Sequence, residues 1–373
     1  MGEEIKEDND ILEGENIETT SSNESVYPAE VRVNREQYAC SHIKTLVEKR
    51  HEVELSPEFQ RENVWENKKK CELVESILMG IPIPVIYLFE NKDGIKQVVD
   101  GKQRISTIIE FQNNKFTLKH LKILPNLNDK KFLDLPLKLQ AKFEDYQLFC
   151  YIIQPPTPER IKYDIFDRVN RAGTLITHQE MREALYRGEV TTILEQLSRS
   201  PEFLNATDKG ISHKRRKDNY VILRSIAFLL MYNKHEEILK LNGSEIEYKS
   251  DIDDFLAKIM IFLNEKANQQ IIDYCTNSFL SAMKRTTEIM GKDAFRLPQK
   301  GKSKRPINMP LFETIVYILA DKKSEKNPQL TRNLINNLKE RWDKDESFLK
   351  SNTDSTLKIN DRFSEAKKIL EQL

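Results

Sequence analysis

The chain has 373 residues, of which 39% are hydrophobic and 32% charged, and its formal net charge is zero. This length favours two domains, and the four scattered cysteines and six histidines form no CxxC or HExxH spacing, which argues against a zinc site and a disulfide framework. There is no signal peptide and no apolar run long enough to cross a bilayer, so we expect a cytoplasmic protein without a membrane partner.

The zero net charge hides an uneven distribution. Residues 1–25 contain nine acidic residues, one basic residue and few large apolar side chains, which predicts a disordered acidic tail. The rest of the chain has 58 basic and 50 acidic residues, a net charge of +8. A basic folded part favours polyanion partners such as DNA, although many helical proteins carry such a charge without binding nucleic acid.

From residue 26 to about 190 the pattern alternates between helix and strand. A first helix is expected around Tyr38–Val47, and a second in "NKKKCELVESILMG", with Asn67 as its N-cap and Gly80 as its stop. The stretch "IPIPVIYLFENKDGIKQVVD" predicts two strands joined by a turn at Asp93-Gly94. A helix then follows directly on Asp100-Gly101-Lys102-Gln103-Arg104.

The pattern after this turn predicts a helix over 137–145, a strand over 148–154 and a helix over 159–173. Thr177 is then expected to cap a further helix, with Glu180 completing a capping box. Beyond about residue 190 only helical periods appear, without a convincing hairpin. The sequence therefore predicts an α+β protein with a tail at 1–25, an α/β-type domain at 26–190 and an all-helical domain at 191–373.

The turn at Asp100–Arg104 has the composition of a phosphate site. A helix N-terminus presents unpaired N–H groups and a positive dipole, and Gly101 lets an anion approach the backbone. Arg104, expected to be exposed, would grip two phosphate oxygens; Gln103 would hold a water or a ribose, and Asp100 would bind Mg²⁺ or polarise a water. The alternative is structural, with Asp100 as an N-cap, Gly101 in a tight turn and Arg104 as a surface base.

Two further strings carry an arginine beside an amide. "PEFQRENVW" contains Gln60 and Arg61 in an extended segment, and "FDRVNRAG" contains Arg168 and Asn170 near a helix end. Taken singly, each also fits a structural reading: a surface arginine beside a core tryptophan, or a helix C-cap. Three such clusters in one domain favour a polyanion site built from separate loops.

These strings resemble a known family. "PEFQRENVW", "ILMGIPIPVIYLFE", "VVDGKQRISTI" and "IFDRVNRAGTLITHQEMREALYRG", in this order, are similar to the N-terminal domain of GmrSD-type, modification-dependent restriction endonucleases. The resemblance covers roughly residues 35–240 and includes "RRKDNYVILRSIAFLL". It implies a ParB/sulfiredoxin-like fold with a D-G-Q-Q-R motif that binds and hydrolyses nucleoside triphosphates, with Mg²⁺ as the expected cofactor, in antiphage defence directed at DNA.

Carried over to this chain, the motif falls on Asp100, Gly101, Gln103 and Arg104, with Lys102 in place of the first glutamine. The resemblance thus implies catalytic roles for Asp100, Gln103 and Arg104, with Asp100 as the metal ligand. Lys102 adds charge for a phosphate but removes an acceptor, so binding is better supported than catalysis. The same resemblance assigns phosphate binding to Gly101, Lys102 and the supporting residues Gln60, Arg61, Arg168 and Asn170.

The resemblance does not extend to a nuclease domain. Two-domain members carry an HNH-type domain with paired histidines and an H-x-x-P string, but here no histidine has a proline three residues later, and none follows His235. We therefore expect a stand-alone member whose isolated chain does not cut DNA and whose partner is a nuclease or another defence protein.

Two functions remain open from the residues. The first is an NTPase that gates a DNA-directed activity, and the second is a non-catalytic module that senses modified DNA or a phosphate ligand through the same pocket. Basic runs at 213–217 and 300–305 are candidate DNA contacts, although such runs are more often solvated loops. The residues concerned are Lys214, Arg215, Arg216, Lys217, Lys300, Lys302, Lys304 and Arg305.

Overall fold

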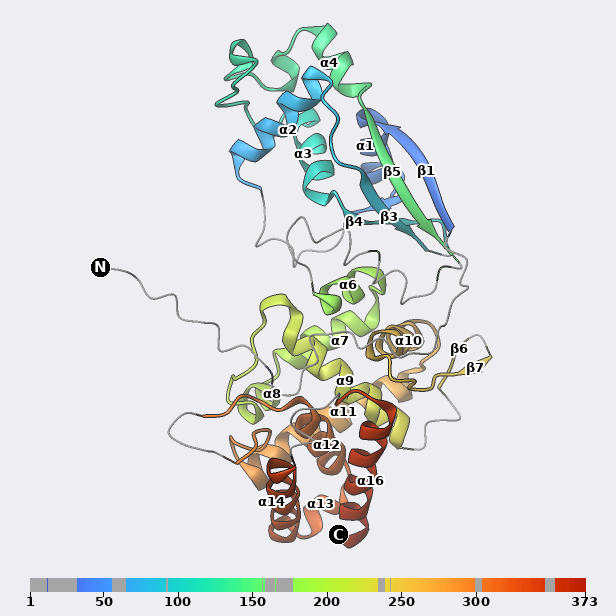
Figure 1. The fold of residues 1–373 in the computed structure, drawn as a ribbon, viewed down its shortest axis with the longest axis vertical. Coiled ribbons are helices and arrows are strands. Elements are labelled where there is room, and N and C mark those ends of the chain that lie inside the picture. Colours follow the sequence, from blue (N-terminus) through green and yellow to red (C-terminus); the bar gives the residue numbers. More distant parts are fainter. Residues whose placement is uncertain are drawn as a thin grey trace, which may run out of the picture. The chain divides into compact units, whose positions relative to one another are not determined.

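The computed structural model describes residues 12, 32–55, 65–91, 93–155, 157, 165, 177–233, 239–241, 243–298, 304–345 and 353–373. The chain divides into two compact units: Val26–Ile176, and Thr177–Leu373 together with Met1–Ser25. The first unit combines a sheet with helices and the second is mainly helical, which confirms the predicted α+β class (Figure 1). We call them the α/β unit and the helical unit.

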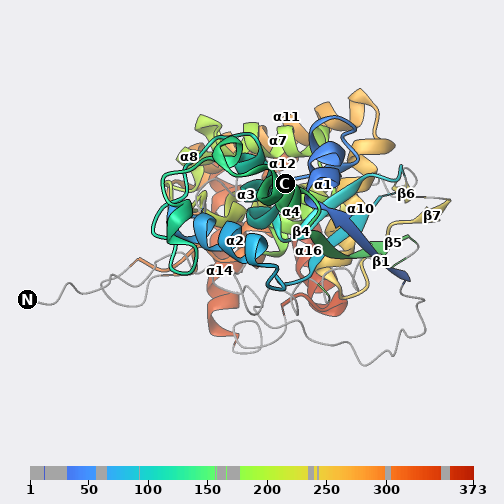
Figure 2. The same cartoon turned by 90° about the horizontal axis from the view of Figure 1, so that it is seen from above.

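The α/β unit contains a five-stranded mixed sheet with the order β1-β5-β3-β4-β2. Strand β1 (Arg32–Ala39) lies antiparallel beside β5 (Gln147–Gln154), which pairs in parallel with β3 (Ile86–Glu90) (Figure 2). Strand β3 is antiparallel to β4 (Lys96–Asp100), and β4 pairs in parallel with the short β2 (Val53–Glu54). This arrangement places β5 and β3 in the interior of the sheet and leaves β1 at an edge.

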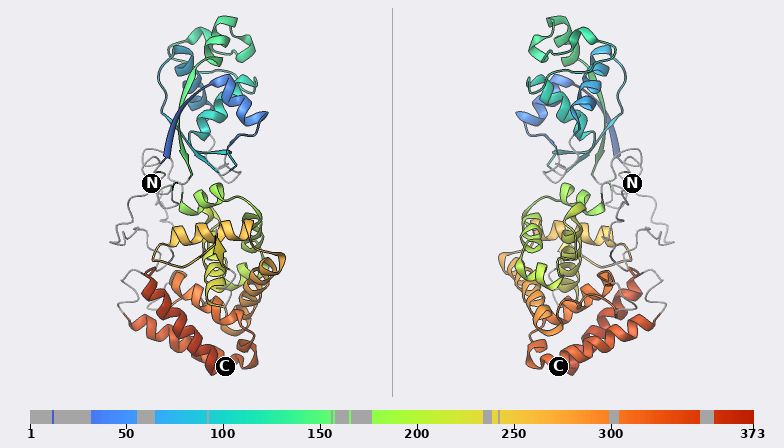
Figure 3. Two further views of the ribbon diagram at one scale, coloured as in Figure 1. Left: turned by 90° about the vertical axis from the view of Figure 1, so that its right-hand side faces the viewer. Right: turned by 90° about the vertical axis from the view of Figure 1, so that its left-hand side faces the viewer.

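Four helices cover one face of this sheet: α1 (Cys40–Glu48), α2 (Asn67–Met79), α3 (Lys102–Gln112) and α4 (Leu137–Glu144) (Figure 3). Two 3-10 turns, Pro125–Leu127 and Phe132–Asp134, lie between α3 and α4 in the sequence. The core between sheet and helices takes alternate strand residues because side chains along a strand alternate between its two faces. From the strands they include Ile86, Leu88, Val98, Leu148, Cys150 and Ile152.

Several expected element ends are confirmed and two are wrong. Gly80 ends α2 with a left-handed φ of 78° and donates its N–H to Ile77 O at 3.0 Å. Gly94, with φ +80°, lies in the turn between β3 and β4. Asn67 is the first residue of α2 rather than its cap, since Glu66 occupies that position. Tyr38 belongs to β1 because it pairs with Leu148 of β5, and the first helix begins only at Cys40.

The helical unit is built around two almost completely buried helices, α9 (Lys217–Tyr232) and α12 (Met309–Ala320). Contrary to the sequence expectation, it also contains a small hairpin, β6 (Lys240–Leu241) and β7 (Ser244–Glu245), whose two-residue strands are too short to give a periodic signal. A 3-10 turn spans Lys214–Arg216, and a π-helical turn spans Thr286–Met290. The other helices are α6 (His178–Leu185), α7 (Glu189–Ser198), α8 (Pro201–Ala206), α10 (Ile252–Glu265), α11 (Gln269–Arg285), α13 (Lys323–Lys326), α14 (Pro328–Lys344) and α16 (Thr356–Gln372).

Within the predicted acidic tail only Leu12 is described, and it is buried with the core of the helical unit. The rest of 1–25 lies outside the described residues. All four cysteines are buried and free: Cys40, Cys71 and Cys150 in the α/β unit and Cys275 in the helical unit. Over the described part of the chain, none of the helices combines the length and the apolar character that a bilayer crossing requires.

Candidate functional site

The Asp100–Arg104 turn lies where β4 ends and α3 begins. Gly101 occupies the N-cap position of α3 with φ +103°, a left-handed conformation that residues with a side chain rarely adopt. A Cβ added to Gly101 would lie 2.8 Å from Ile86 Cγ1 in the neighbouring strand. Glycine is therefore required here twice, once by the backbone angle and once by the close approach of Ile86.

The beginning of α3 gives the turn a positive electrostatic character. Ile105 donates the first intrahelical N–H bond to Gly101 O at 2.9 Å, so the N–H groups of Lys102, Gln103 and Arg104 lie outside the helical ladder. Lys102 is the first helical residue, and burial lowers the pKa of its ammonium group. The turn thus combines the positive end of a helix dipole with a partly buried lysine at the first helical position.

Arg104 has a different environment from the one predicted. Its side chain is buried, with 9% of its surface exposed. One guanidinium nitrogen donates to the carbonyl oxygens of Pro84 and Val85, the latter at 3.2 Å, and another pairs with the Asp100 carboxylate. The expectation of an exposed arginine is wrong because these backbone carbonyls draw the guanidinium inward, where it connects the start of β3 to the end of β4.

Asp100 and Gln103 remain closer to solvent or to other segments. The Asp100 side chain is 33% exposed, with Oδ2 engaged by Arg104. Gln103 Oε1 accepts the backbone N–H of Trp65 at 3.3 Å. Across the described residues no three His, Cys, Asp or Glu side chains form a metal-ligand group. One half-exposed carboxylate does fit Mg²⁺, which is usually held by one or two carboxylates together with substrate phosphates.

The two supporting strings cannot be placed around this turn. Gln60, Arg61, Arg168 and Asn170 lie outside the described residues. The predicted convergence of three arginine-and-amide clusters therefore stays a prediction. The turn itself is the described part of the candidate site.

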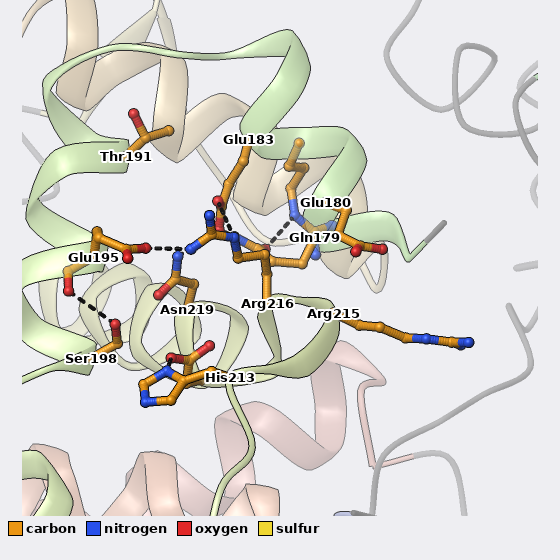
Figure 4. A network of polar contacts seen from close by, with 12 residues as sticks. Gln179, Glu180, Glu183, Thr191, Glu195, Ser198, His213, Arg215, Arg216 and Asn219 are labelled. Carbon is orange, nitrogen blue, oxygen red and sulfur yellow. Dashed lines mark hydrogen bonds and ion pairs between the residues drawn. The ribbon is translucent and has the colours of Figure 1, made fainter. Parts of the chain in front are cut away.

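The first basic run, Lys214–Lys217, divides into two pairs. Arg216 lies inside a polar network, where it pairs with Glu195 and approaches Glu183 Oε2 at 3.5 Å, whereas Arg215 points away from it (Figure 4). Both arginines have left-handed φ angles, 55° and 57°, a conformation that is costly for non-glycine residues. Lys214 and Arg215 are exposed, while Arg216 and Lys217 are partly buried.

The second basic run is also paired within the chain. Lys304 Nζ lies 3.0 Å from Asp208 Oδ2 and 3.1 Å from Asp293 Oδ1, and Arg305 Nη1 lies 2.5 Å from Asp343 Oδ1. Lys300 and Lys302 lie outside the described residues. Of the predicted DNA contacts in the described parts, Lys214 and Arg215 present their charge most openly.

Sequence reasoning did not single out the aromatic residues on the uncovered face of the sheet. Phe149 and Tyr151 alternate with Leu148, Cys150 and Ile152 along β5, and only the latter three enter the core beneath the helices. The signal was present in "LFCYIIQ", where two aromatic residues, Phe149 and Tyr151, alternate with core residues. It passed unnoticed because the whole string resembles a strand buried on both faces.

A family model matches the part of the chain that contains this turn. Residues 43–187 match the family model of the N-terminal domain of the GmrSD restriction endonuclease, a match that runs from α1 through α6 and includes the Asp100–Arg104 turn. Residues 43–187, which are 145 of the 373 residues of the chain, are thus similar to the N-terminal domain of a restriction endonuclease of the GmrSD type. The comparison with curated proteins gave no match.

Proposed function

We propose that this protein is a nucleotide-binding, NTP-hydrolysing component of a restriction-type antiphage system. The phosphates would bind at the Asp100–Arg104 turn. The observation that carries the proposal is Gly101, whose φ of +103° and contact with Ile86 bring the positive end of α3 against the half-exposed Asp100. Anions bind at such helix starts because backbone N–H groups and the helix dipole both favour negative charge.

Each residue of the turn receives a role from its surroundings. The N–H groups at the start of α3 and the Lys102 ammonium bind phosphate oxygens. Gln103 holds a water or a ribose hydroxyl, and Asp100 orients the attacking water. Arg104 acts as a positioning residue, since its contacts with Asp100 and with the Pro84 and Val85 carbonyls hold the acid beside the turn. Magnesium bound with the nucleotide would neutralise phosphate charge, and Asp100 is its candidate ligand.

Binding is tested most directly at Lys102. Lys102→Ala should weaken binding of ATP or GTP, measured with Mg²⁺ by calorimetry, about ten- to a hundredfold, because a hydrogen bond to a charged group is lost. Lys138→Ala, at an exposed lysine of α4 in the same unit, is the matched control and should bind normally. Normal affinity in a correctly folded Lys102→Ala protein would refute the phosphate site.

Turnover separates the enzyme from the alternative, a non-catalytic sensor that uses the same pocket. Gln103→Ala should slow phosphate release in a steady-state assay about a hundredfold or more while nucleotide affinity changes little, if Gln103 holds the water that Asp100 orients. Absence of any turnover by the wild-type chain, with and without DNA, would favour the sensor.

DNA binding by the helical unit is a second proposal, supported by the outward direction of Arg215 (Figure 4). Phosphate contacts release counterions, so log affinity falls with log salt by about 0.9 for each contact. Replacing Lys214 and Arg215 by glutamine should flatten this slope by about two. Replacing Lys304 and Arg305, which already pair with acids, should flatten it less. Equal effects of the two double variants would contradict this ranking.

A further inference from the structure

The sheet of the α/β unit has a second face that none of its described helices covers (Figure 3). Side chains alternate along each strand, so the residues between the core positions point to this face. On β5 these are Phe149 and Tyr151, and on β3 the corresponding residue is Tyr87, which is paired with Tyr151 in the parallel register. Strands β5 and β3 are interior strands, so these rings stand in the middle of the sheet rather than at its edge.

The aromatic side chains on this face are arranged as a platform. The ring centroids of Tyr87 and Tyr151 are 5.5 Å apart with an interplanar angle of 59°. The guanidinium of Arg35, in β1, lies 5.4 Å from the centroid of the Tyr151 ring. Phe149 is 55% exposed, which is unusual for so large an apolar side chain within a sheet. We call Arg35, Tyr87, Phe149 and Tyr151 the aromatic face.

The exposed part of this face lies on β1 and β5. Among the described residues of these two strands that alternate onto it, Arg35 alone is charged; it is exposed, and Gln37 beside it offers an amide. The residues of β1, β5 and β3 on this face are Val33, Arg35, Gln37, Ala39, Tyr87, Phe89, Gln147, Phe149, Tyr151 and Ile153, of which Phe89 and Ile153 are buried. The acids Glu54 and Asp100 belong to the β2 and β4 side of the sheet, where they pair with Gln97 and Tyr87. Near Arg35, aromatic rings with a cation and an amide complement a ligand that has flat π surfaces and negative charge.

We propose that the aromatic face binds single-stranded DNA by stacking unpaired bases on Phe149 and Tyr151. Base–aromatic stacking tolerates any sequence because every base has a π face, and Arg35 supplies the charge that tracks the phosphate backbone. A duplex hides the faces of its bases within the stack, so it fits this surface poorly. The similarity of residues 43–187 to a restriction-endonuclease domain supports DNA as the source of these bases. The proposal does not rest on nucleotide binding at the Asp100–Arg104 turn, although Tyr87 pairs with Asp100 in the register of β3 and β4.

The test uses the full chain and fluorescence anisotropy with a labelled 12-nucleotide single strand of mixed sequence. Phe149→Ala should weaken binding about five- to a hundredfold, the range found for loss of one stacking contact. An abasic strand of equal length keeps the phosphates but lacks the bases, and should bind the wild-type protein correspondingly worse. Leu133→Ala, at an exposed leucine of the same unit outside the sheet, is the matched control and should bind as the wild type does.

Phe149 is suited to this test because its side chain is exposed, so Phe149→Ala should fold normally, which a melting curve checks. Tyr151→Leu serves as the second variant; it removes the aromatic π surface but keeps apolar bulk against Tyr87, and it should lose affinity as well. The proposal would be overturned by equal affinity for the abasic strand, by wild-type affinity in both variants, or by no binding of the mixed strand. It would also be overturned by tenfold tighter binding of the RNA of the same sequence, or by a wild-type dimer that Phe149→Ala dissociates.

Discussion

The two units both bury arginines, but they balance the charge differently. In the helical unit Arg224 and Arg362 share Glu313, and Arg224 also pairs with Asp354 at 2.6 Å. Two guanidinium groups thus meet two carboxylates in the interior. In the α/β unit Arg104 has one carboxylate partner, the half-exposed Asp100, and otherwise contacts two backbone carbonyls.

This difference indicates which region mainly stabilises the fold and which region can bind a ligand. Both buried carboxylates of the helical network are already paired with guanidinium groups, so this network serves packing and orientation. The turn in the α/β unit keeps an acid near solvent beside the positive end of a helix, an arrangement that can accept a phosphate and a water. The comparison predicts that substitutions in the first region change stability, whereas substitutions in the second change both stability and binding.

The largest effect is expected at Glu313. Glu313→Gln leaves Arg224 and Arg362 buried with Asp354 as their remaining carboxylate, and breaking a buried ion pair costs about 3–5 kcal/mol. Urea denaturation of the full chain would measure the loss. Glu265→Gln, at an exposed glutamate of α10, is the matched control and should stay within about 0.5 kcal/mol of the wild type. An equal response of the two variants would refute the network's role.

A smaller loss is expected at Arg104. Arg104→Lys keeps the charge but cannot reach Asp100 and the Pro84 and Val85 carbonyls together, so it should cost about 2–3 kcal/mol. Nucleotide affinity should fall as well, because Asp100 loses its orientation. A variant that binds poorly yet unfolds at the wild-type urea concentration would show that Arg104 contacts the phosphate directly instead.

Two of the glycines with a left-handed φ, Gly101 and Gly80, form an internal comparison. Gly101→Ala should destabilise the protein by about 1–3 kcal/mol through backbone strain and, in addition, displace Ile86. Gly80→Ala meets the same kind of strain at φ +78° with nothing within 4 Å of the added Cβ. The difference between the two variants in the free energy of unfolding, measured in urea, isolates the cost of the Ile86 contact. Equal losses of stability would show that Ile86 in β3 moves aside at little cost.

The smallest effect concerns pH. Burial raises the pKa of Glu183 above its ordinary 4.5, although the Asn219 and Gln179 amides donate to its carboxylate and oppose this. Above pH 4.5 the folded state therefore holds more protons than the unfolded state, and this contribution to stability falls as the pH rises through the raised pKa. Glu183→Gln should remove the decline, so the stability of wild type relative to variant should drop between pH 4.5 and neutrality. A pH-independent difference would refute the assignment.

The features read correctly from the sequence are local ones. The Thr177 capping box is confirmed, since its hydroxyl accepts from Glu180 N–H while the Glu180 carboxylate accepts from Thr177 N–H. All the required atoms lie within three residues, so the chain alone specifies them. The glycine stop at Gly80 was readable for the same reason.

Features that depend on distant residues were not readable. Arg104 was expected at the surface because its carbonyl partners lie 19 and 20 residues earlier and only the folded sheet brings them together. The partners of Arg224 lie 89 and 130 residues away. Strand β1 was missed because its pairing with β5 spans more than 100 residues, and its polar, exposed side chains carry little alternation.

The buried thiols can report the unfolding of each unit separately. Burial raises the pKa of Cys40, Cys150 and Cys275 to about 12, and that of Cys71 above its ordinary value, so these thiols react slowly with alkylating reagents while the fold is closed. Three of them sit in the α/β unit and one in the helical unit. Pulsed alkylation followed by peptide mass spectrometry therefore times the unfolding of the two units separately, in the unmodified protein and within a single sample.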